Sequence, residues 1–458
     1  MVYLRLALLS FIPLISFFIL PVSGYVKDTI YTPRIILIVG MAIIGNLILF
    51  HLYSGKKSLL GAMREVLRPR PLKLAIVSYA IWLCVSSSFS VMPGYSWLGH
   101  PYTQFGTIAL LGCLSLAYLY YKVMRAELIM RIMSFCVLVM AALTFLESLG
   151  YRPLSQVVQS PNMLYPAALV GHRPHLGGWF SIVVLMPAYF YRDRKLDGWF
   201  WAWTLSGIIG LGLCTTTSAT LGVGFALSLW LLYSWLKRRE RFKSVLLLVA
   251  AFAISVATLP SIVQSVGAKL KLNPPQLKDY GSTGSMEPRL YMWKSAWHAA
   301  TDRPWTGWGT DTFGYQVFEH LENNDAEALF RAELGFKKDY VVEHKGMTYY
   351  AYKREGADKD EQTGSLLYVR PHNLIVDELY SNGFIGLILF FLAATFFIKR
   401  IGKAKIPSSL PYFAISCLPY FIYLQAWFYI VSVTPIFFIL LGIMLKDSEQ
   451  GGSKYVQR

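Results

Sequence analysis

The chain has 458 residues, of which 55% are hydrophobic and only 15% are charged. Its mean hydropathy is +0.44. Soluble globular domains carry about 25% charged residues, so the composition excludes a soluble domain and indicates a membrane protein. The formal net charge of +17 would suit a nucleic-acid-binding protein, unless the basic residues are placed to set membrane topology.

Twelve apolar stretches follow one another along the chain, each about 15 to 25 residues long, and we expect each to cross a hydrocarbon core of about 30 Å. The last two could instead form one long helix broken around Gln425. We therefore expect an all-α polytopic membrane protein of about 12 transmembrane helices. The stretches are 4–22, 35–53, 74–92, 105–121, 128–149, 176–191, 199–213, 220–236, 245–266, 374–398, 410–424 and 428–445.

Every second connection between these stretches is basic, and short basic loops stay in the cytoplasm. Both termini are therefore expected in the cytoplasm. The excess of basic over acidic residues is therefore explained by membrane topology, and this excludes nucleic-acid binding as its explanation. The basic residues are Lys56, Lys57, Arg64, Arg68, Arg70 and Lys73, then Lys122 and Arg125, then Arg192, Arg194 and Lys195, then Lys237, Arg238, Arg239, Arg241 and Lys243, and finally Lys399, Arg400, Lys403 and Lys405.

This alternation divides the chain into four parts. Residues 1–265 hold helices 1–9 and residues 266–371 form a large extracytoplasmic loop. Residues 372–445 hold helices 10–12 and residues 446–458 form a cytoplasmic tail. The N-terminal stretch is long enough to span a bilayer, so we interpret it as a retained helix and not as a signal peptide.

Within the large loop, residues 286–301 have the spacing of an amphipathic helix, with Leu290, Trp293, Trp297 and Ala300 on one face. We expect this helix to lie against the membrane. The stretches 340–342 and 348–352 are strand-like, whereas no motif is assigned to 319–364.

Three polar clusters on the predicted outer side are candidates for chemistry, because titratable residues at a membrane surface usually serve a function. The first contains His172, Arg173 and His175. The second contains Arg289, Trp293 and Arg303, and the third contains Arg370, His372 and Asn373. The five cysteines lie in apolar stretches without metal-ligand spacing, so no metal site is predicted.

Each cluster has a structural and a functional interpretation. His372 and Asn373 either cap a helix or place an imidazole for proton transfer. Arg289 and Trp293 either belong to an interfacial belt or hold a phosphate and a sugar. Arg173 is either a further anion contact or the outer end of a helix.

The order of these clusters relative to the stretches resembles the O-antigen ligase and polymerase family of polytopic membrane glycosyltransferases. Arg289 followed by Pro304, Gly307 and Gly309 resembles one family motif. A second, more specific one is matched by His372 and Asn373 with Gly383 and Gly386, and the glycine-rich stretch 171–178 resembles a third. The chain departs from the family at Ser218-Ala219, where members often carry Ser-Arg.

The resemblance implies a GT-C-like, metal-independent, inverting transferase without a cofactor, in the bacterial cytoplasmic membrane with its active site outside. Its donor would be a glycan on undecaprenyl pyrophosphate and its acceptor a hydroxyl of a lipid core, growing glycan or protein, with membrane lipids around it. His372 and Arg289 would be catalytic. The substrate-binding residues would be Arg173, His172, His175, Trp293, Arg303, Arg370 and Asn373.

Ligase, polymerase and protein O-oligosaccharyltransferase share this chemistry, and we favour them in that order. A polysaccharide or lipid transporter and a scaffold are the alternatives from other classes. A transporter should carry ionisable residues near the midplane of several helices, and this sequence has few.

Overall fold

The computed structural model describes residues 2–20, 25, 27–54, 70–153, 166–275, 286–334, 340–344, 349–354, 361–365, 368–404 and 408–450. The basic residues predicted between positions 55 and 69, Lys405, the end of the tail and parts of the large loop lie outside this set. Each of the twelve predicted apolar stretches coincides with a helix or a pair of helices.

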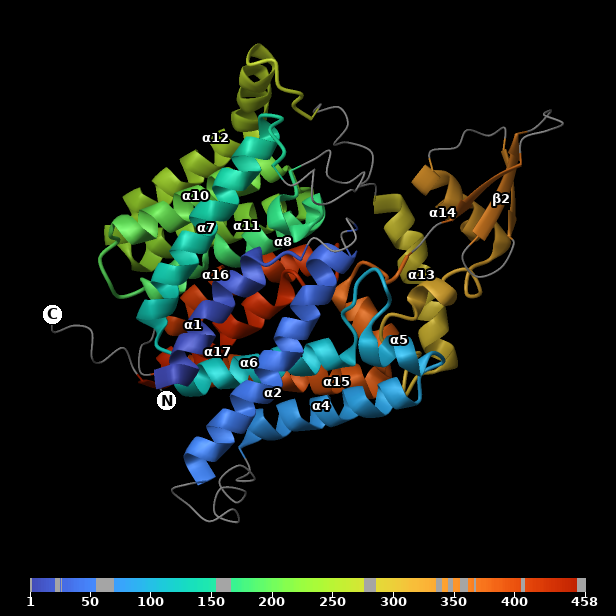
Figure 1. The fold of residues 1–458 in the computed structure, drawn as a ribbon, viewed down its shortest axis with the longest axis horizontal. Coiled ribbons are helices and arrows are strands. Elements are labelled where there is room, and N and C mark those ends of the chain that lie inside the picture. Colours follow the sequence, from blue (N-terminus) through green and yellow to red (C-terminus); the bar gives the residue numbers. More distant parts are fainter. Residues whose placement is uncertain are drawn as a thin grey trace.

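The helices that coincide with the apolar stretches form one bundle (Figure 1). They are α1 (Val2–Phe17), α2 (Thr32–Ser54), α4 (Pro71–Ser88), α6 (Thr107–Val123), α7 (Ala126–Ser148), α8 (Arg173–Val183), α9 (Met186–Phe190), α10 (Gly198–Cys214), α11 (Thr217–Lys237), α12 (Arg239–Lys269), α15 (Leu374–Gly402), α16 (Ser409–Leu424) and α17 (Thr434–Gln450).

The remaining elements connect or cover the bundle. Short helices lie at α5 (Pro93–Leu98), η1 (Lys27–Tyr31), η3 (Ala168–Val170) and η5 (Phe313–Tyr315), and the large loop holds α13 (Met286–Asp302), α14 (Asn323–Leu334) and the antiparallel sheet β1 (Tyr340–His344), β2 (Tyr349–Arg354) and β3 (Glu361–Ser365). The two strand-like stretches of the sequence fall in β1 and β2. Over the residues that the structure describes, the fold is thus helical apart from this small sheet.

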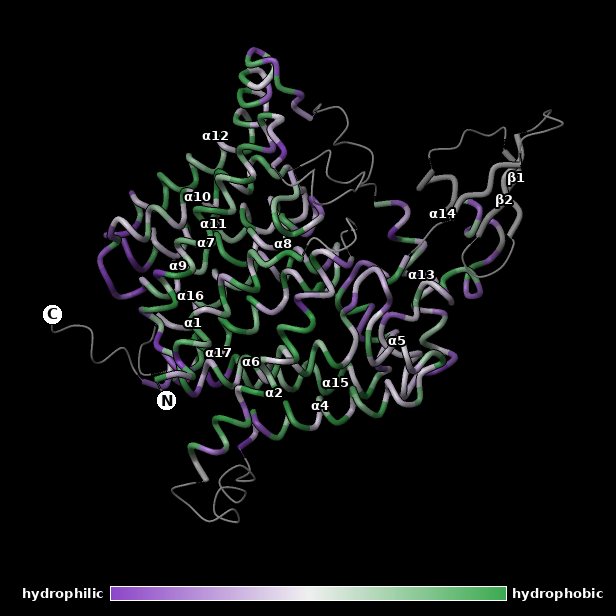
Figure 2. The backbone as a smooth tube through the Cα atoms, viewed as in Figure 1, coloured by the Kyte–Doolittle hydropathy of each residue, from purple (hydrophilic) through white to green (hydrophobic). Residues whose placement is uncertain are grey.

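Six helices are long and apolar enough to cross a membrane, and four shorter ones are apolar, among the described residues. Between 11% and 50% of each long helix's apolar window is buried, so much of the apolar surface faces outward, as lipid-facing helices require. Figure 2 shows hydrophobic residues along the bundle and hydrophilic ones at connections such as α9–α10. The chain is therefore a membrane protein.

The bundle is held by neighbours that are distant in sequence. α15 packs on α4, α17 on α6, α16 on α11 and α10 on α7. Figure 1 shows the start of α1 and the end of α17 at one end of the molecule, and α13, α14 and the sheet at the other. These elements of the large loop therefore lie at the end of the bundle remote from the start of α1 and the end of α17.

The sixth apolar stretch is not one helix, contrary to prediction, because α8 ends at Val183 and α9 begins at Met186. Pro187 has no N–H to donate to the carbonyl of Val183 four residues earlier. The indole of Trp203 donates to that carbonyl instead, at 2.8 Å. Pro187 of α9 and Trp203 of α10 thus stabilise the break.

α13 occupies the segment with the predicted amphipathic pattern, but its buried face differs. Leu290 and Trp297 are 53% and 55% exposed, whereas Met292, Ala296 and Ala299 are buried. The reason is that α13 packs on α14 and α15 through its small side chains, which leaves the larger apolar residues outside.

Candidate active site

Two glycine-containing segments of the predicted motifs form one structural unit. α15 is interrupted at Gly383, whose φ is +65°. There the amide of Phe384 donates to Pro304 O (2.8 Å), while Trp308 donates to Tyr380 O (2.9 Å). A Cβ on Gly383 would lie 2.2 Å from Trp305 O, which no real side chain permits. The glycines therefore dock the loop after α13 onto the break in α15.

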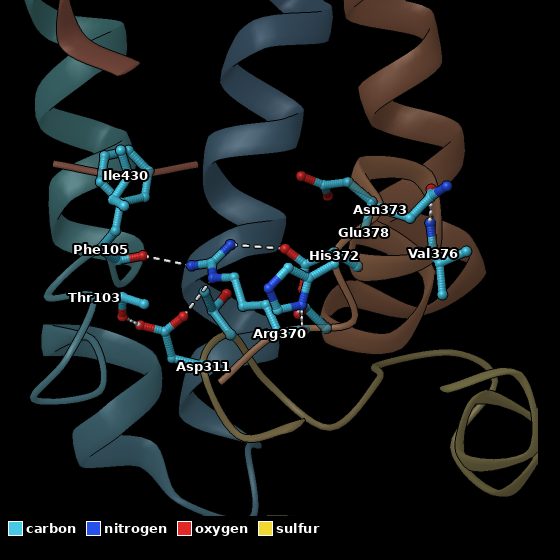
Figure 3. A network of polar contacts seen from close by, with 12 residues as sticks. Thr103, Phe105, Asp311, Arg370, His372, Asn373, Val376, Glu378 and Ile430 are labelled. Carbon is cyan, nitrogen blue, oxygen red and sulfur yellow. Dashed lines mark hydrogen bonds and ion pairs between the residues drawn. The ribbon is translucent and has the colours of Figure 1, made fainter. Parts of the chain in front are cut away.

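Arg370 lies in a buried ion network beside this unit (Figure 3). Its Nε is 2.5 Å from Asp311 and its Nη1 is 2.7 Å from Asp377. Its Nη2 donates to Phe105 O at 2.7 Å, and Asp311 also accepts from the amide of His100 at 2.8 Å. Arg370 joins the loop before α6, the loop after α13 and the first turn of α15. These internal partners engage all three guanidinium nitrogens, so we do not carry Arg370 forward as a donor contact.

The backbone of Arg370 orients His372. Arg370 O lies 2.9 Å from His372 Nδ1, and a carbonyl can only accept, so Nδ1 carries the proton and Nε2 keeps its lone pair. His372 has a φ of +56°, a conformation that is uncommon outside glycine. Such strain is maintained where the surroundings fix the backbone, as the ion network does here.

Asn373 caps α15, as the structural interpretation predicts. Its side-chain oxygen accepts from the amides of Ile375 (3.0 Å) and Val376 (3.1 Å). Its amide nitrogen donates to Gln425 O at 3.3 Å. The cap and the oriented imidazole occur together, so one interpretation does not displace the other.

The first and third clusters meet in space. The ring centroids of His172 and His175 are 4.8 Å apart, and Trp427 lies 6.2 Å from the first ring and 5.7 Å from the second. Trp427 is also 4.8 Å from the ring of His372. A hydrogen bond of 2.9 Å joins the Tyr31 hydroxyl to His175 Nδ1. Three histidines from segments about 200 residues apart thus surround one indole.

The second cluster reaches the same place through α13. The Trp293 indole donates to Pro371 O at 2.9 Å, one residue before His372. Arg289 lies one turn earlier on the same face. Burial, and then the charge of Arg289, lower the pKa of His372 from 6.5 to about 3. Arg289 and His372 are therefore electrostatically coupled.

The other two predicted arginines contact residues of other segments. Arg173 reaches Thr215 Oγ1 at 3.4 Å, in the turn just before α11 and close in sequence to the departure at Ser218-Ala219. Burial, and then Arg173, lower the pKa of His172 to about 4. Arg303 stacks on Trp308 at 4.7 Å and donates to Phe89 O at 3.4 Å, so it belongs to the docked loop.

Sequence reasoning did not find Trp427, Tyr31 or Asp311. The signal for Trp427 was the doubt about a broken helix at Gln425, since residues 425–433 are non-helical between α16 and α17. Asp311 lies two residues after Gly309 of the predicted motif, but the sequence indicated no partner for its carboxylate. No group of three histidine, cysteine or acidic side chains with metal-ligand geometry occurs among the described residues.

Comparison with known families supports the resemblance. Residues 202–391 match the family model described as O-antigen ligase. Residues 202–391 are thus similar to the O-antigen ligase family. The matched segment contains Arg289, Arg370 and His372, whereas His172 and Trp427 lie outside it. No curated protein matches the chain.

Proposed function

We propose that this protein transfers a glycan from an undecaprenyl-pyrophosphate donor to an acceptor hydroxyl at the extracytoplasmic face of the bacterial cytoplasmic membrane. The family assignment supports glycosyltransferase-like activity. The observation that carries the proposal is the geometry of His372: its Nδ1 donates to Arg370 O at 2.9 Å, so Nε2 keeps its lone pair, and the charge of Arg289 acts on this ring. We favour the ligase reaction, in which the acceptor belongs to a lipid core.

The proposed topology has about twelve spans in a GT-C-like arrangement, with both termini in the cytoplasm. The basic connections support it, and so does the position of the start of α1 and the end of α17 at the end remote from α13 and the sheet (Figure 1). The break between α8 and α9 keeps the sixth stretch as a single interrupted span. His372 and Arg289 then face the outside.

In the proposed reaction the acceptor oxygen attacks the anomeric carbon of the donor and His372 Nε2 takes its proton. The bond from that carbon to the pyrophosphate oxygen breaks, and the configuration inverts. Arg289 stabilises the charge that grows on the leaving pyrophosphate, and Arg173 supplies a second guanidinium near the start of α11. We propose that these arginines, and not a metal ion, carry this charge.

The low pKa of His372 is consistent with this role. It keeps the imidazole neutral, so Nε2 can accept a proton at neutral pH. A bound pyrophosphate would add negative charge beside it, which raises the pKa of an imidazole. His372 thus becomes a stronger base when the donor is present.

The test is glycan transfer by purified protein in lipid vesicles, with a lipid-linked donor and a lipid-core acceptor. His372→Ala should lower the rate by about 10²–10⁴, and Arg289→Ala by about 10²–10³. His298→Ala is the matched control, because His298 is exposed on the same loop. Wild-type rates in both site variants would overturn the mechanism. Transfer only onto a growing glycan or a protein would overturn the ligase assignment.

A further inference from the structure

The connector between α16 and α17 brings an aromatic residue into the candidate site. Residues 425–433 are non-helical, and the contact of Asn373 with Gln425 O, at 3.3 Å, ties their start to α15. Trp427 follows two residues later, beside His172, His175 and His372. This connector lies beyond residues 202–391, so the family match assigns it no role.

Three rings lie around the indole of Trp427. His172 and Phe428 are nearly parallel to it, at 6.2 Å and 18° and at 5.3 Å and 13°. His372 stands nearly perpendicular to it, at 80°. The one group of this indole that can form a hydrogen bond with a ligand is its N–H.

Two polar atoms of this group are buried without a partner among the described residues. They are Trp427 Nε1 and His172 Nδ1. Native proteins rarely leave such atoms unsatisfied, because each costs about 1–3 kcal/mol. The unprotonated nitrogen of a neutral imidazole accepts a hydrogen bond, and an indole N–H can only donate one. In the tautomer that carries its proton on Nε2, His172 Nδ1 is an acceptor, so the two atoms together offer one donor and one acceptor.

We propose that Trp427 Nε1 and His172 bind a single hydroxyl of the first sugar of the lipid-linked donor. A hydroxyl accepts from the indole and donates to the imidazole, whereas a phosphate oxygen can only accept. His172 adjoins Arg173 and Trp427 adjoins His372, so this hydroxyl lies between the proposed anion contact and the proposed base. The inference rests on the proposed function and identifies a sugar-binding group within it.

The test compares the binding of two ligands, glycosylated undecaprenyl pyrophosphate and undecaprenyl pyrophosphate, to protein in vesicles without an acceptor. Trp427→Phe removes the N–H and keeps an aromatic ring. It should weaken binding of the glycosylated ligand about three- to tenfold, the effect of one lost hydrogen bond. Binding of the sugar-free ligand should change less than twofold.

Two further variants make the result specific. His172→Phe should give the same sugar-dependent loss, and the double variant should lose little more than either single variant, because both act on one hydroxyl. Trp230→Phe is the control. Trp230 packs against Phe200 and Tyr412, about 20 Å along α11 from its start, so its replacement should leave both affinities unchanged.

Equal losses for the two ligands would place the contact on the pyrophosphate and overturn the inference. Unchanged affinities, or an effect limited to the acceptor's KM, would overturn it as well. If His372→Ala retained normal transfer while Trp427→Phe showed the sugar-dependent loss, the catalytic proposal would fail and the sugar contact would stand. A wild-type protein that bound neither ligand would refute both.

Discussion

Arg370 and His372 are two residues apart, yet their surroundings differ in how many polar atoms have partners. Around Arg370, two carboxylates and a backbone carbonyl engage all three guanidinium nitrogens. Around His372, Nδ1 donates to a carbonyl and Nε2 keeps its lone pair, while Trp427 Nε1 and His172 Nδ1 lack partners among the described residues. Polar groups with all their partners suit a structural role, whereas unsatisfied ones suit a ligand. This difference separates Arg370, which stabilises the fold, from Arg289, which we propose as a ligand contact.

The largest expected loss of stability follows from removing Arg370 from its ion network. Arg370→Met leaves Asp311 and Asp377 buried together without a cation, which costs about 3–5 kcal/mol. The thermal unfolding midpoint of the purified protein should fall strongly. Arg400→Met is the control, because its pair with Glu449 at 2.8 Å has side chains 44% and 25% exposed and such pairs contribute at most about 1 kcal/mol. Equal midpoints for the two variants would contradict the comparison.

A smaller loss of stability is expected when the cap of α15 at Asn373 is removed. Asn373→Ala removes the cap of α15 and should cost about 1 kcal/mol, seen as a modest fall of the midpoint. Asn373→Asp keeps an oxygen that accepts from Ile375 and Val376 but loses the donor to Gln425 O. The aspartate variant should therefore keep its midpoint. If it lost as much as the alanine variant, the contact with the connector would outweigh the cap.

The smallest expected effect is on pH dependence. The pKa values of His372 and His172 lie at about 3 and about 4, so both rings stay neutral between pH 7 and 5. The kcat/KM of transfer, which reflects the free enzyme, should show no ionisation near 6.5. A fall of kcat/KM with a midpoint near 6.5 would contradict the buried, cation-facing environment of His372.

The same pKa values predict the direction in which the stability of the fold changes with pH. Below pH 6.5 the histidines of the unfolded chain bind protons that the folded chain does not. Their contribution to stability is thus complete above pH 6.5 and is lost progressively as the pH falls toward 4 and 3. The unfolding midpoint should decline over that range even where kcat/KM stays level.

The sequence predicted most of the helices, because their apolar stretches are long and the bilayer permits little else. It missed the break between α8 and α9, which depends on Trp203 reaching a carbonyl 20 residues away. It proposed His372 and Arg289 as catalytic residues, which stays a prediction, and it also proposed Arg370 as a ligand contact, although Arg370 is engaged by Asp311 and Asp377. Whether an arginine faces a ligand or a carboxylate depends on partners such as Asp311, which is 59 residues away in the sequence.

The interruption at Gly383 also changes where the outer structural unit of the molecule ends. By composition the outer segment ends at residue 371, where the apolar stretch begins. By its hydrogen bonds, however, the segment 374–382 belongs to the loop after α13, and it carries Asp377 of the ion network. The rest of α15 lies in the bundle. A segment exchanged between relatives to alter acceptor choice should therefore extend from α13 through Gly383, so that the proposed catalytic histidine, the cap and the ion network are transferred together.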